Sequence, residues 1–181
     1  MVETTSWPLN EVQHKAGGAI LNRTGYGASD TFTRPNNTTA YASGDVLGDS
    51  TSTSSALEFT NIAGAGGGDV LITSASLEID VSAIPSGMTS FRLYLYSVTP
   101  PSALADNAAW DLPAGDRASF LGYVDLGSPV DLGSTLYVEV NGVNKQVTAA
   151  STSLFGYLVT TTGYTPTAQA VKKVTLHTVA L

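Results

Sequence analysis

Alternation of apolar and polar residues predicts that most of this chain is β-structure. The clearest run covers residues 70–81 and should place one set of side chains on a single face of a strand: Leu71, Thr73, Ala75, Leu77, Ile79 and Val81. Residues 91–98 alternate aliphatic positions (Phe91, Leu93, Leu95) with Arg92, Tyr94 and Tyr96. This second pattern is typical of a sheet with one buried face and one half-exposed face.

Shorter strand-like segments separated by turn residues continue along the rest of the chain. They are residues 39–47, 56–62, 121–126, 135–140, 146–148, 154–162 and 170–179. Asn141-Gly142 predicts a hairpin, because both central residues of a type I′ turn need positive φ. No segment resembles the 10 to 15 residue helices that parallel α/β folds place between strands. Eight or nine strands therefore predict an all-β, antiparallel two-sheet sandwich, with one short helical turn within 114–120.

The first 38 residues follow neither the strand period nor the helix period. They are rich in Thr, Asn and Gly and carry isolated apolar side chains. The pattern predicts an extended N-terminal arm at 1–38, followed by a sandwich domain at 39–181. Two roles remain open for the apolar residues of the arm: they cover the edge of their own domain, or they dock on another subunit.

Composition limits the classes of partner. The 181 residues carry a net charge of -7, and their basic residues are scattered except for Lys172-Lys173. Binding to nucleic acid or to an anionic membrane needs clustered basic residues, so neither partner is expected. The first ten residues lack the basic start and apolar block of a secretory signal, and no stretch reaches the roughly 20 apolar residues that span a bilayer. Synthesis in a cytoplasm is therefore expected, and the absence of Cys fits a reducing compartment.

Motifs for catalysis or metal binding are weak, and no catalytic residue, metal site or cofactor is predicted. The two histidines, His14 and His177, are far apart, and the chain has neither Gly-x-Ser-x-Gly nor His-Glu-x-x-His. Gly64–Asp69 is glycine-rich but lacks the Gly-Lys-Ser/Thr of a phosphate loop. Five aspartates between 106 and 131 could ligate calcium, although Asp in such loops more often caps turns.

Aromatic residues are the remaining candidates for binding. Several tyrosines and two tryptophans could form a sugar-stacking surface, as in carbohydrate-binding sandwiches, or could serve structure and interfaces. The residue types alone do not separate these roles.

Two parts of the chain resemble virion proteins that tailed bacteriophages encode near their major capsid protein. The first, residues 32–48, contains Arg34-Pro35, Asn37-Thr38, Tyr41 and Gly44-Asp45-Val46. The second contains Arg92–Tyr96, the Ala105-Asp106-Asn107-Ala108-Ala109-Trp110 run and Leu121-Gly122-Tyr123. The resemblance implies a non-enzymatic cement or decoration protein of the capsid with a jelly-roll-like sandwich. It supplies no catalytic residues.

The resemblance implies a role on the capsid surface of a virion whose proteins are made in the cytoplasm of a bacterial host. The major capsid protein is the expected partner, and a homo-oligomer, either a dimer or a trimer, is the expected state. The residues expected to contact capsid or sister subunits are Trp7, Leu9, Val12, Phe32 and Arg34. A tail or baseplate component and a glycan-binding module for host attachment remain alternatives.

Overall fold

A computed structural model describes residues 24–181 of the chain. The described part contains ten β-strands and no helix. In chain order they are β1 (Gly25–Thr33), β2 (Val46–Leu47), β3 (Leu57–Phe59), β4 (Gly68–Ile79), β5 (Phe91–Tyr96), β6 (Phe120–Gly127), β7 (Val130–Asp131), β8 (Leu136–Ala149), β9 (Leu154–Thr160) and β10 (Val171–Ala180).

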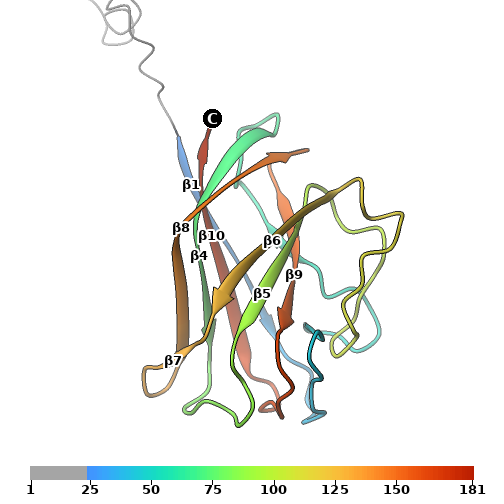
Figure 1. The fold of residues 1–181 in the computed structure, drawn as a ribbon, viewed down its shortest axis with the longest axis vertical. Coiled ribbons are helices and arrows are strands. Elements are labelled where there is room, and N and C mark those ends of the chain that lie inside the picture. The colour runs from blue at the N-terminus through green and yellow to red at the C-terminus, as the bar shows by residue number, and fades with distance from the viewer. Residues whose placement is uncertain (1–23) are drawn as a thin grey trace, which may run out of the picture.

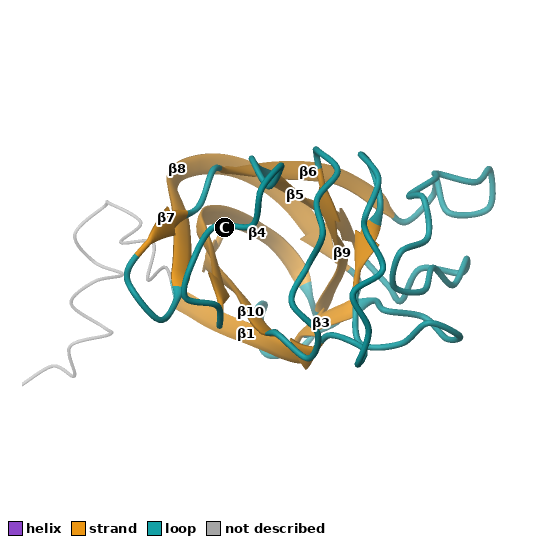
Figure 2. Ribbon diagram, turned by 90° about the horizontal axis from the view of Figure 1, so that it is seen from below, coloured by secondary structure: helices purple, strands orange, loops and turns teal. Residues whose placement is uncertain are grey.

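The strands form two antiparallel sheets that face each other (Figures 1 and 2). One sheet has the order β1-β10-β4-β8-β7, and the other has the order β2-β9-β5-β6, with β3 also pairing with β9. The chain passes repeatedly from one sheet to the other, so that β4 pairs with β8 and β5 pairs with β9. This connectivity makes the domain an all-β sandwich of the jelly-roll type.

The sandwich begins earlier than the sequence pattern predicts. Residues 25–33, expected in the arm, form β1 and pair along their whole length with β10. The strand pattern is weak there because Ala28 and Phe32 alone in β1 turn fully inward, and the residues between them are small or polar. Neighbouring β10 thus decides the conformation of a segment whose own sequence gives little signal.

A β-bulge at Thr73 divides β4 into two halves. Even-numbered residues face the core before the bulge, and odd-numbered residues face it after the bulge. The register with β10 passes from Ser74 opposite His177 to Ile72 opposite Thr178, so Thr73 is an extra residue. Ala75, Leu77 and Ile79 face the core as predicted, but before the bulge Val70 and Ile72 are buried in place of Leu71 and Thr73. An uninterrupted alternation is therefore wrong for the first half of the strand.

The predicted hairpin at Asn141-Gly142 is also wrong. Strand β8 continues through it, and residues 142–144 form an outward bulge opposite Thr73 of β4. Gly142 (φ 68°) and Asn144 (φ 50°) both adopt positive φ in this bulge. The residue types that favour a tight turn are thus used to bend a long strand.

The predicted helical turn within 114–120 is replaced by hydrogen-bonded turns. Asp116 N donates to Pro113 O at 3.0 Å, and Phe120 N donates to Asp116 O at 3.1 Å. Asp116 also uses its carboxylate to accept from the backbone N and the hydroxyl of Ser102. These bonds to the start of the same loop hold the turn in place without a helix.

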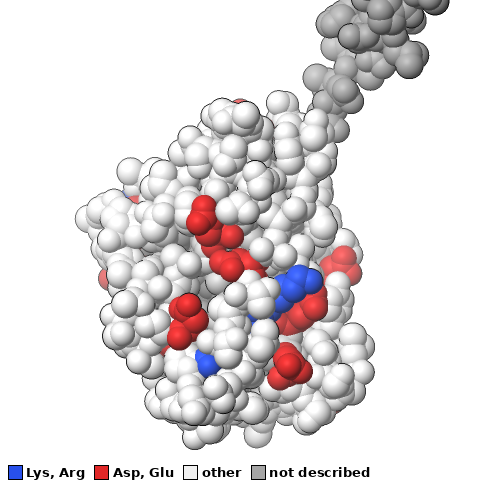
Figure 3. All heavy atoms as spheres, turned by 180° about the vertical axis from the view of Figure 1, so that it is seen from behind, with Lys and Arg blue, Asp and Glu red and all other residues white. Residues whose placement is uncertain are grey.

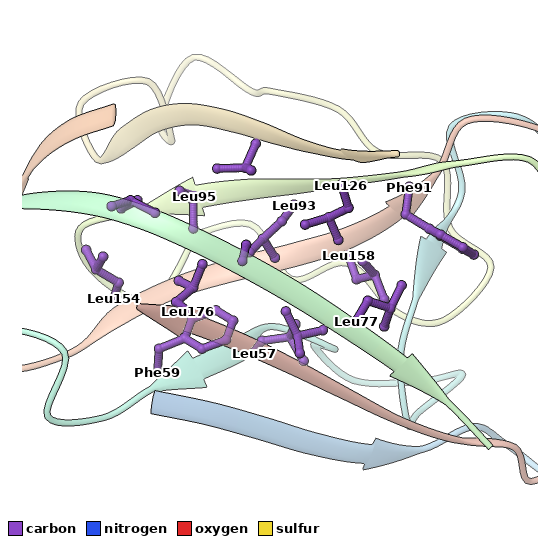
Figure 4. Close-up of a cluster of buried hydrophobic side chains, with 14 of the residues drawn as sticks. Leu57, Phe59, Leu77, Phe91, Leu93, Leu95, Leu126, Leu154, Leu158 and Leu176 are labelled. Atoms are coloured by element: carbon purple, nitrogen blue, oxygen red, sulfur yellow. The ribbon is translucent and has the colours of Figure 1, made fainter. Parts of the chain in front are cut away.

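Leucine and phenylalanine side chains from both sheets fill the space between them (Figure 4). Leu77 and Leu176 come from one sheet, and Leu93 and Leu158 from the other, and all four are fully buried. Burial of each such side chain stabilises the fold by roughly 1.5–3 kcal/mol. Side chains of both sheets thus form one continuous hydrophobic core.

Candidate functional site

Two long segments lie against the outer face of the β9-β5-β6 part of the β2-β9-β5-β6 sheet: residues 34–56, which include the two-residue strand β2, and residues 97–119. We call them the loop layer. Beneath it lies a second hydrophobic cluster formed by Val46, Tyr96, Tyr157 and Val159, with Leu104, Trp110 and Leu112 packed on it from the loops. The Tyr157 hydroxyl fixes the layer by donating to Ser102 O and accepting from Leu104 N. Both faces of this sheet are consequently apolar.

The loop layer brings together the two segments that carry the family resemblance. Asp45 forms an isolated antiparallel bridge with Ala109. Val46 N donates to Ala108 O at 2.8 Å, Asn107 N donates to Val46 O at 2.9 Å, and Trp110 N donates to Gly44 O at 2.9 Å. The Gly-Asp-Val run and the Ala-Asp-Asn-Ala-Ala run are thus neighbouring parts of one structure.

Arg34 is the centre of a buried polar network below this pairing. Its guanidinium donates to the Tyr41 hydroxyl (2.9 Å), to Asn37 Oδ1 (2.9 Å) and Thr39 O (3.1 Å), and to the backbone oxygen of Asn37. Asp106 Oδ2 lies 3.9 Å from Arg34 Nη2. Arginine can serve all these acceptors at once because its donors are fixed in a planar fork.

Tyr41 links the arginine to the aspartate. Its hydroxyl accepts from Arg34 Nε and donates to Asp106 Oδ1 at 2.5 Å, and Gly48 N also donates to that oxygen. Burial first, and then the hydrogen bond and charge of Asp106, raise the pKa of Tyr41 well above its ordinary value. The hydroxyl therefore stays protonated as a permanent donor to the carboxylate.

Two of the residues expected to contact other subunits are buried in their own domain. Arg34 is 1% exposed and Phe32 is 7% exposed, so neither side chain offers a surface to a partner. Arg34 organises the loop layer, and Phe32 packs in the core beside Lys172, its cross-strand neighbour. The expected contact role is therefore wrong for these two side chains. The other three, Trp7, Leu9 and Val12, lie outside the described residues.

An exposed group of aromatic and charged residues lies at the margin of the loop layer. We call it the Arg92–Tyr123 surface, formed by Arg92, Tyr94, Trp110, Tyr123 and Asp125. Trp110 stacks on Tyr94 with ring centroids 3.7 Å apart and an interplanar angle of 13°. Tyr123 is 45% exposed.

Arg92 holds this surface together. Its Nε donates to Asp125 Oδ1 at 2.6 Å, and its guanidinium carbon lies 4.9 Å from the centroid of the Tyr123 ring. The hydrogen bond to Asp125 is the main cause that raises the pKa of Arg92, so the side chain remains cationic. The arginine is thus oriented by a carboxylate and an aromatic ring while it stays accessible.

Two hollows flank the Arg92–Tyr123 surface. The larger, of about 440 Å³, lies between β6 and the β8 bulge, and Tyr123, Val143, Asn144 and Lys145 are among its lining residues. The smaller, of about 220 Å³, is lined by Arg92, Tyr94 and hydroxyl-bearing residues of β9 and the loop layer.

The chemistry of the acidic loops is structural in the described chain. Asp131 accepts from Gly133 N and Asp111 from Leu112 N, as expected for residues that cap turns. Within residues 24–181 no three His, Cys, Asp or Glu side chains are grouped to hold a metal ion. His177 is exposed on β10, and His14 lies outside the described residues.

The sequence pattern gave little warning of the Arg34 network. Arg34 is 7 residues before Tyr41, and Tyr41 is 65 residues before Asp106, and no spacing rule connects the three. A usable signal is the placement of these three residues within the segments that share the family resemblance. The Arg92–Tyr123 surface has a stronger signal, because Arg92 and Tyr94 alternate with the core residues of β5.

Comparisons with known proteins do not identify the chain. No protein-family model matches it, and no curated protein matches it in sequence. Among residues 24–181, no helix has the length and apolar character needed to cross a membrane.

Among solved structures, one similar chain is the C-terminal CBM6 module of LamC, a marine laminarinase from Zobellia galactanivorans. It is 14% identical, covers 87% of this chain and 100% of its own, and has a TM-score of 0.30. A chain of the Kashmir bee virus virion at acidic pH is 15% identical, with 99% and 81% coverage and a TM-score of 0.30. At such TM-scores, these likenesses carry no argument about function.

Proposed function

We propose that this chain is a structural virion protein of the cement or decoration type, which binds and stabilises a capsid shell. The observation that carries the proposal is the pairing of residues 44–46 with residues 107–110 over the buried Arg34–Tyr41–Asp106 network. Those residues carry the resemblance to phage cement proteins, and in this fold they act together. Residues 44–46 and 107–110 come from the two separate stretches of that resemblance, and their cooperation in one loop layer makes the two matches more informative together than two unrelated short matches.

The exposed chemistry supports an adhesive role. Arginine and tyrosine are among the residues that contribute most energy at protein interfaces, and the Arg92–Tyr123 surface presents both, with the half-buried Trp110 ring stacked on Tyr94 beside them. Acidic side chains predominate on the opposite face of the domain (Figure 3), and the net charge of -7 disfavours contact with packaged nucleic acid. We therefore place capsid attachment at the Arg92–Tyr123 surface.

Residues 1–23 are proposed as a second attachment element, with Trp7, Leu9 and Val12 as apolar anchors. They precede Thr24, whose carbonyl accepts from Ala180 N near the end of the chain. Two weak contacts on one subunit reinforce each other, because the first raises the effective concentration for the second. A dimer or trimer on the capsid surface multiplies this effect.

The test measures binding of the purified full chain to shells assembled from the major capsid protein of the same virus. Replacing both Arg92 and Tyr123 by Ala should weaken binding by tenfold or more, as expected for interface hot spots. The matched control is Lys173→Ala, which removes an exposed side chain of the other sheet and should leave binding unchanged. Deleting residues 1–23 should weaken binding independently.

If the Arg92/Tyr123 double variant bound the shells as tightly as the parent chain, the Arg92–Tyr123 surface would not be the attachment site. Absence of this polypeptide from purified virions would remove the proposal itself. Cryo-EM of the particle separates a capsid position from a tail or baseplate position.

A glycan-binding role is the second candidate, favoured by the exposed Tyr123 ring beside the 440 Å³ hollow with Asn144 and Lys145. An exposed aromatic ring next to amide and ammonium groups can stack on a sugar and bond its hydroxyls. A saturable signal on a glycan array, lost in Tyr123→Ala, would establish this function in place of capsid attachment.

A further inference from the structure

Five polar side chains lie together in the interior at the end of the β1–β10 ladder. Arg34 and Lys172 are each 1% exposed, Tyr41 is 3% exposed, Tyr164 is 4% exposed and Asp106 is 5% exposed. Arg34 and Lys172 approach from the same ladder, since Lys172 is opposite Phe32 and Arg34 N donates to Ala170 O. Asp106 comes from the loop layer, and Tyr164 is paired with Tyr41.

Some donors and acceptors in this cluster have hydrogen-bond partners, and others have none. Arg34 and Tyr41 have hydrogen-bond partners, and Asp106 Oδ1 accepts from Tyr41 and Gly48. Within the described chain, Lys172 Nζ, the Tyr164 hydroxyl and Asp106 Oδ2 have no hydrogen-bond partner. Buried polar atoms nearly always have one, so the two unpartnered donors, Lys172 Nζ and the Tyr164 hydroxyl, indicate an additional acceptor, whereas Asp106 Oδ2 faces Arg34 Nη2 at 3.9 Å.

The charges are also unbalanced. The cluster contains two cationic side chains, Arg34 and Lys172, and one carboxylate, Asp106. Burial, reinforced by the charge of Arg34, lowers the pKa of Lys172 to about 8, so the amine is still largely protonated at neutral pH. The Phe32 ring, 5.6 Å from Nζ, offers a weak partial compensation. A net positive charge in the interior is costly unless a counter-charge neutralises it.

We propose that this cluster binds a small monovalent anion of the chloride type, held by the Lys172 ammonium and the Tyr164 hydroxyl. Both groups can donate to an anion, and neither has a hydrogen-bond partner in the described chain. A metal cation does not fit, because the cluster supplies one carboxylate against two cations. A single negative charge balances the net charge of the cluster, and because all five side chains are at least nine-tenths buried the anion enters through a transient opening of the domain. The site is independent of the proposed attachment function.

The test measures the thermal unfolding midpoint of the full chain at pH 7 and constant ionic strength, while chloride replaces gluconate. The midpoint should rise with chloride and saturate, because an anion that binds the folded state stabilises it by mass action. The rise should disappear in Lys172→Met. It should persist in the matched control Lys173→Met, which removes the adjacent lysine whose side chain pairs with Glu78 outside the core.

Crystals grown with bromide provide a second measurement that does not depend on the variants. Anomalous density beside Lys172 Nζ and Tyr164 supports the site, and Tyr164→Phe should weaken the chloride effect if Lys172→Met fails to fold. Equal midpoints in chloride and gluconate, a chloride effect of the same size in Lys172→Met, or water without bromide beside Nζ would each overturn the proposal.

Discussion

The hydroxyl of Tyr41 donates a 2.5 Å hydrogen bond to Oδ1 of Asp106, 65 residues further along the chain. This bond connects the two parts of the loop layer. Because the Tyr41 hydroxyl also accepts from Arg34, it bridges the guanidinium and a buried carboxylate. Because these residues are also among those that resemble phage virion proteins in sequence, the shared residue types serve the construction of the loop layer. The surface that touches a partner has to be sought outside this network.

The buried pair of Arg34 and Asp106 should matter far more for stability than the exposed pair of Arg92 and Asp125. Asp106→Ala leaves the Arg34 charge buried without its carboxylate and should lower the free energy of unfolding by about 3–5 kcal/mol. Asp125→Ala, the matched control, should cost about 0–1 kcal/mol, since both partners are exposed. Urea unfolding curves measure both values, and similar losses in the two variants would contradict the assignment.

Stability should depend on pH with a maximum near pH 10. Burial lowers the pKa of Lys172 from 10.5 to about 8 in the folded chain, so between pH 8 and pH 10.5 the unfolded state binds more protons than the folded state. The free energy of unfolding should therefore rise with pH from about 8 towards 10, on the order of 2 kcal/mol.

Above pH 10 the free energy of unfolding should fall as the pH rises, because burial raises the pKa of Tyr41 and Tyr164 above the unfolded value of 10.0. The unfolded tyrosines then release protons that the folded ones retain, and stability falls. Urea denaturation at pH 7 to 11 in chloride-free gluconate buffer measures both limbs, because a bound chloride would stabilise the charged amine and raise the pKa of Lys172. In Lys172→Met the rise should vanish while the fall remains, and a rise of unchanged size would contradict the assignment to Lys172.

Gly67 should not tolerate a side chain. Its φ is +75°, and a Cβ there would lie 2.4 Å from the carbonyl oxygen of Ala149. Gly67→Ala should destabilise the domain by about 1–2 kcal/mol from the left-handed backbone alone, with the collision in addition. Gly115→Ala, where a Cβ meets no atom within 4 Å, is the control and should change little. Thermal unfolding compares them, and equal midpoints would show that the turn at Gly67 can rearrange.

Deletion of Thr73 should be strongly destabilising although the residue is not part of the core. Without the bulge, Val70 and Ile72 would turn outward, and each is now at most 1% exposed. Loss of both side chains from the core should cost about 3–6 kcal/mol. Deletion of exposed Gly115 in the loop layer serves as the comparison. A Thr73 deletion with the stability of the parent chain would mean that the strand corrects its register elsewhere.

The pattern of residues along the chain was enough to predict an all-β sandwich, and for a direct reason. Alternation in residues 75–79 and 91–95 reflects the period of a strand whose two faces meet different environments, and this is a local property. Charge and the absence of cysteine are likewise independent of the fold. Strand type and the chemistry excluded by composition therefore follow from sequence.

The tertiary structure decided everything that depends on residues meeting across the fold. It made β1 a strand by pairing it with β10, moved Val70 and Ile72 into the core through the Thr73 bulge, and turned Asn141-Gly142 from a hairpin into a bend. It also buried Arg34 beside Asp106 instead of exposing it to a partner. Bulges, sheet edges and buried ion pairs are settled by neighbours distant in sequence, whose positions no local period encodes.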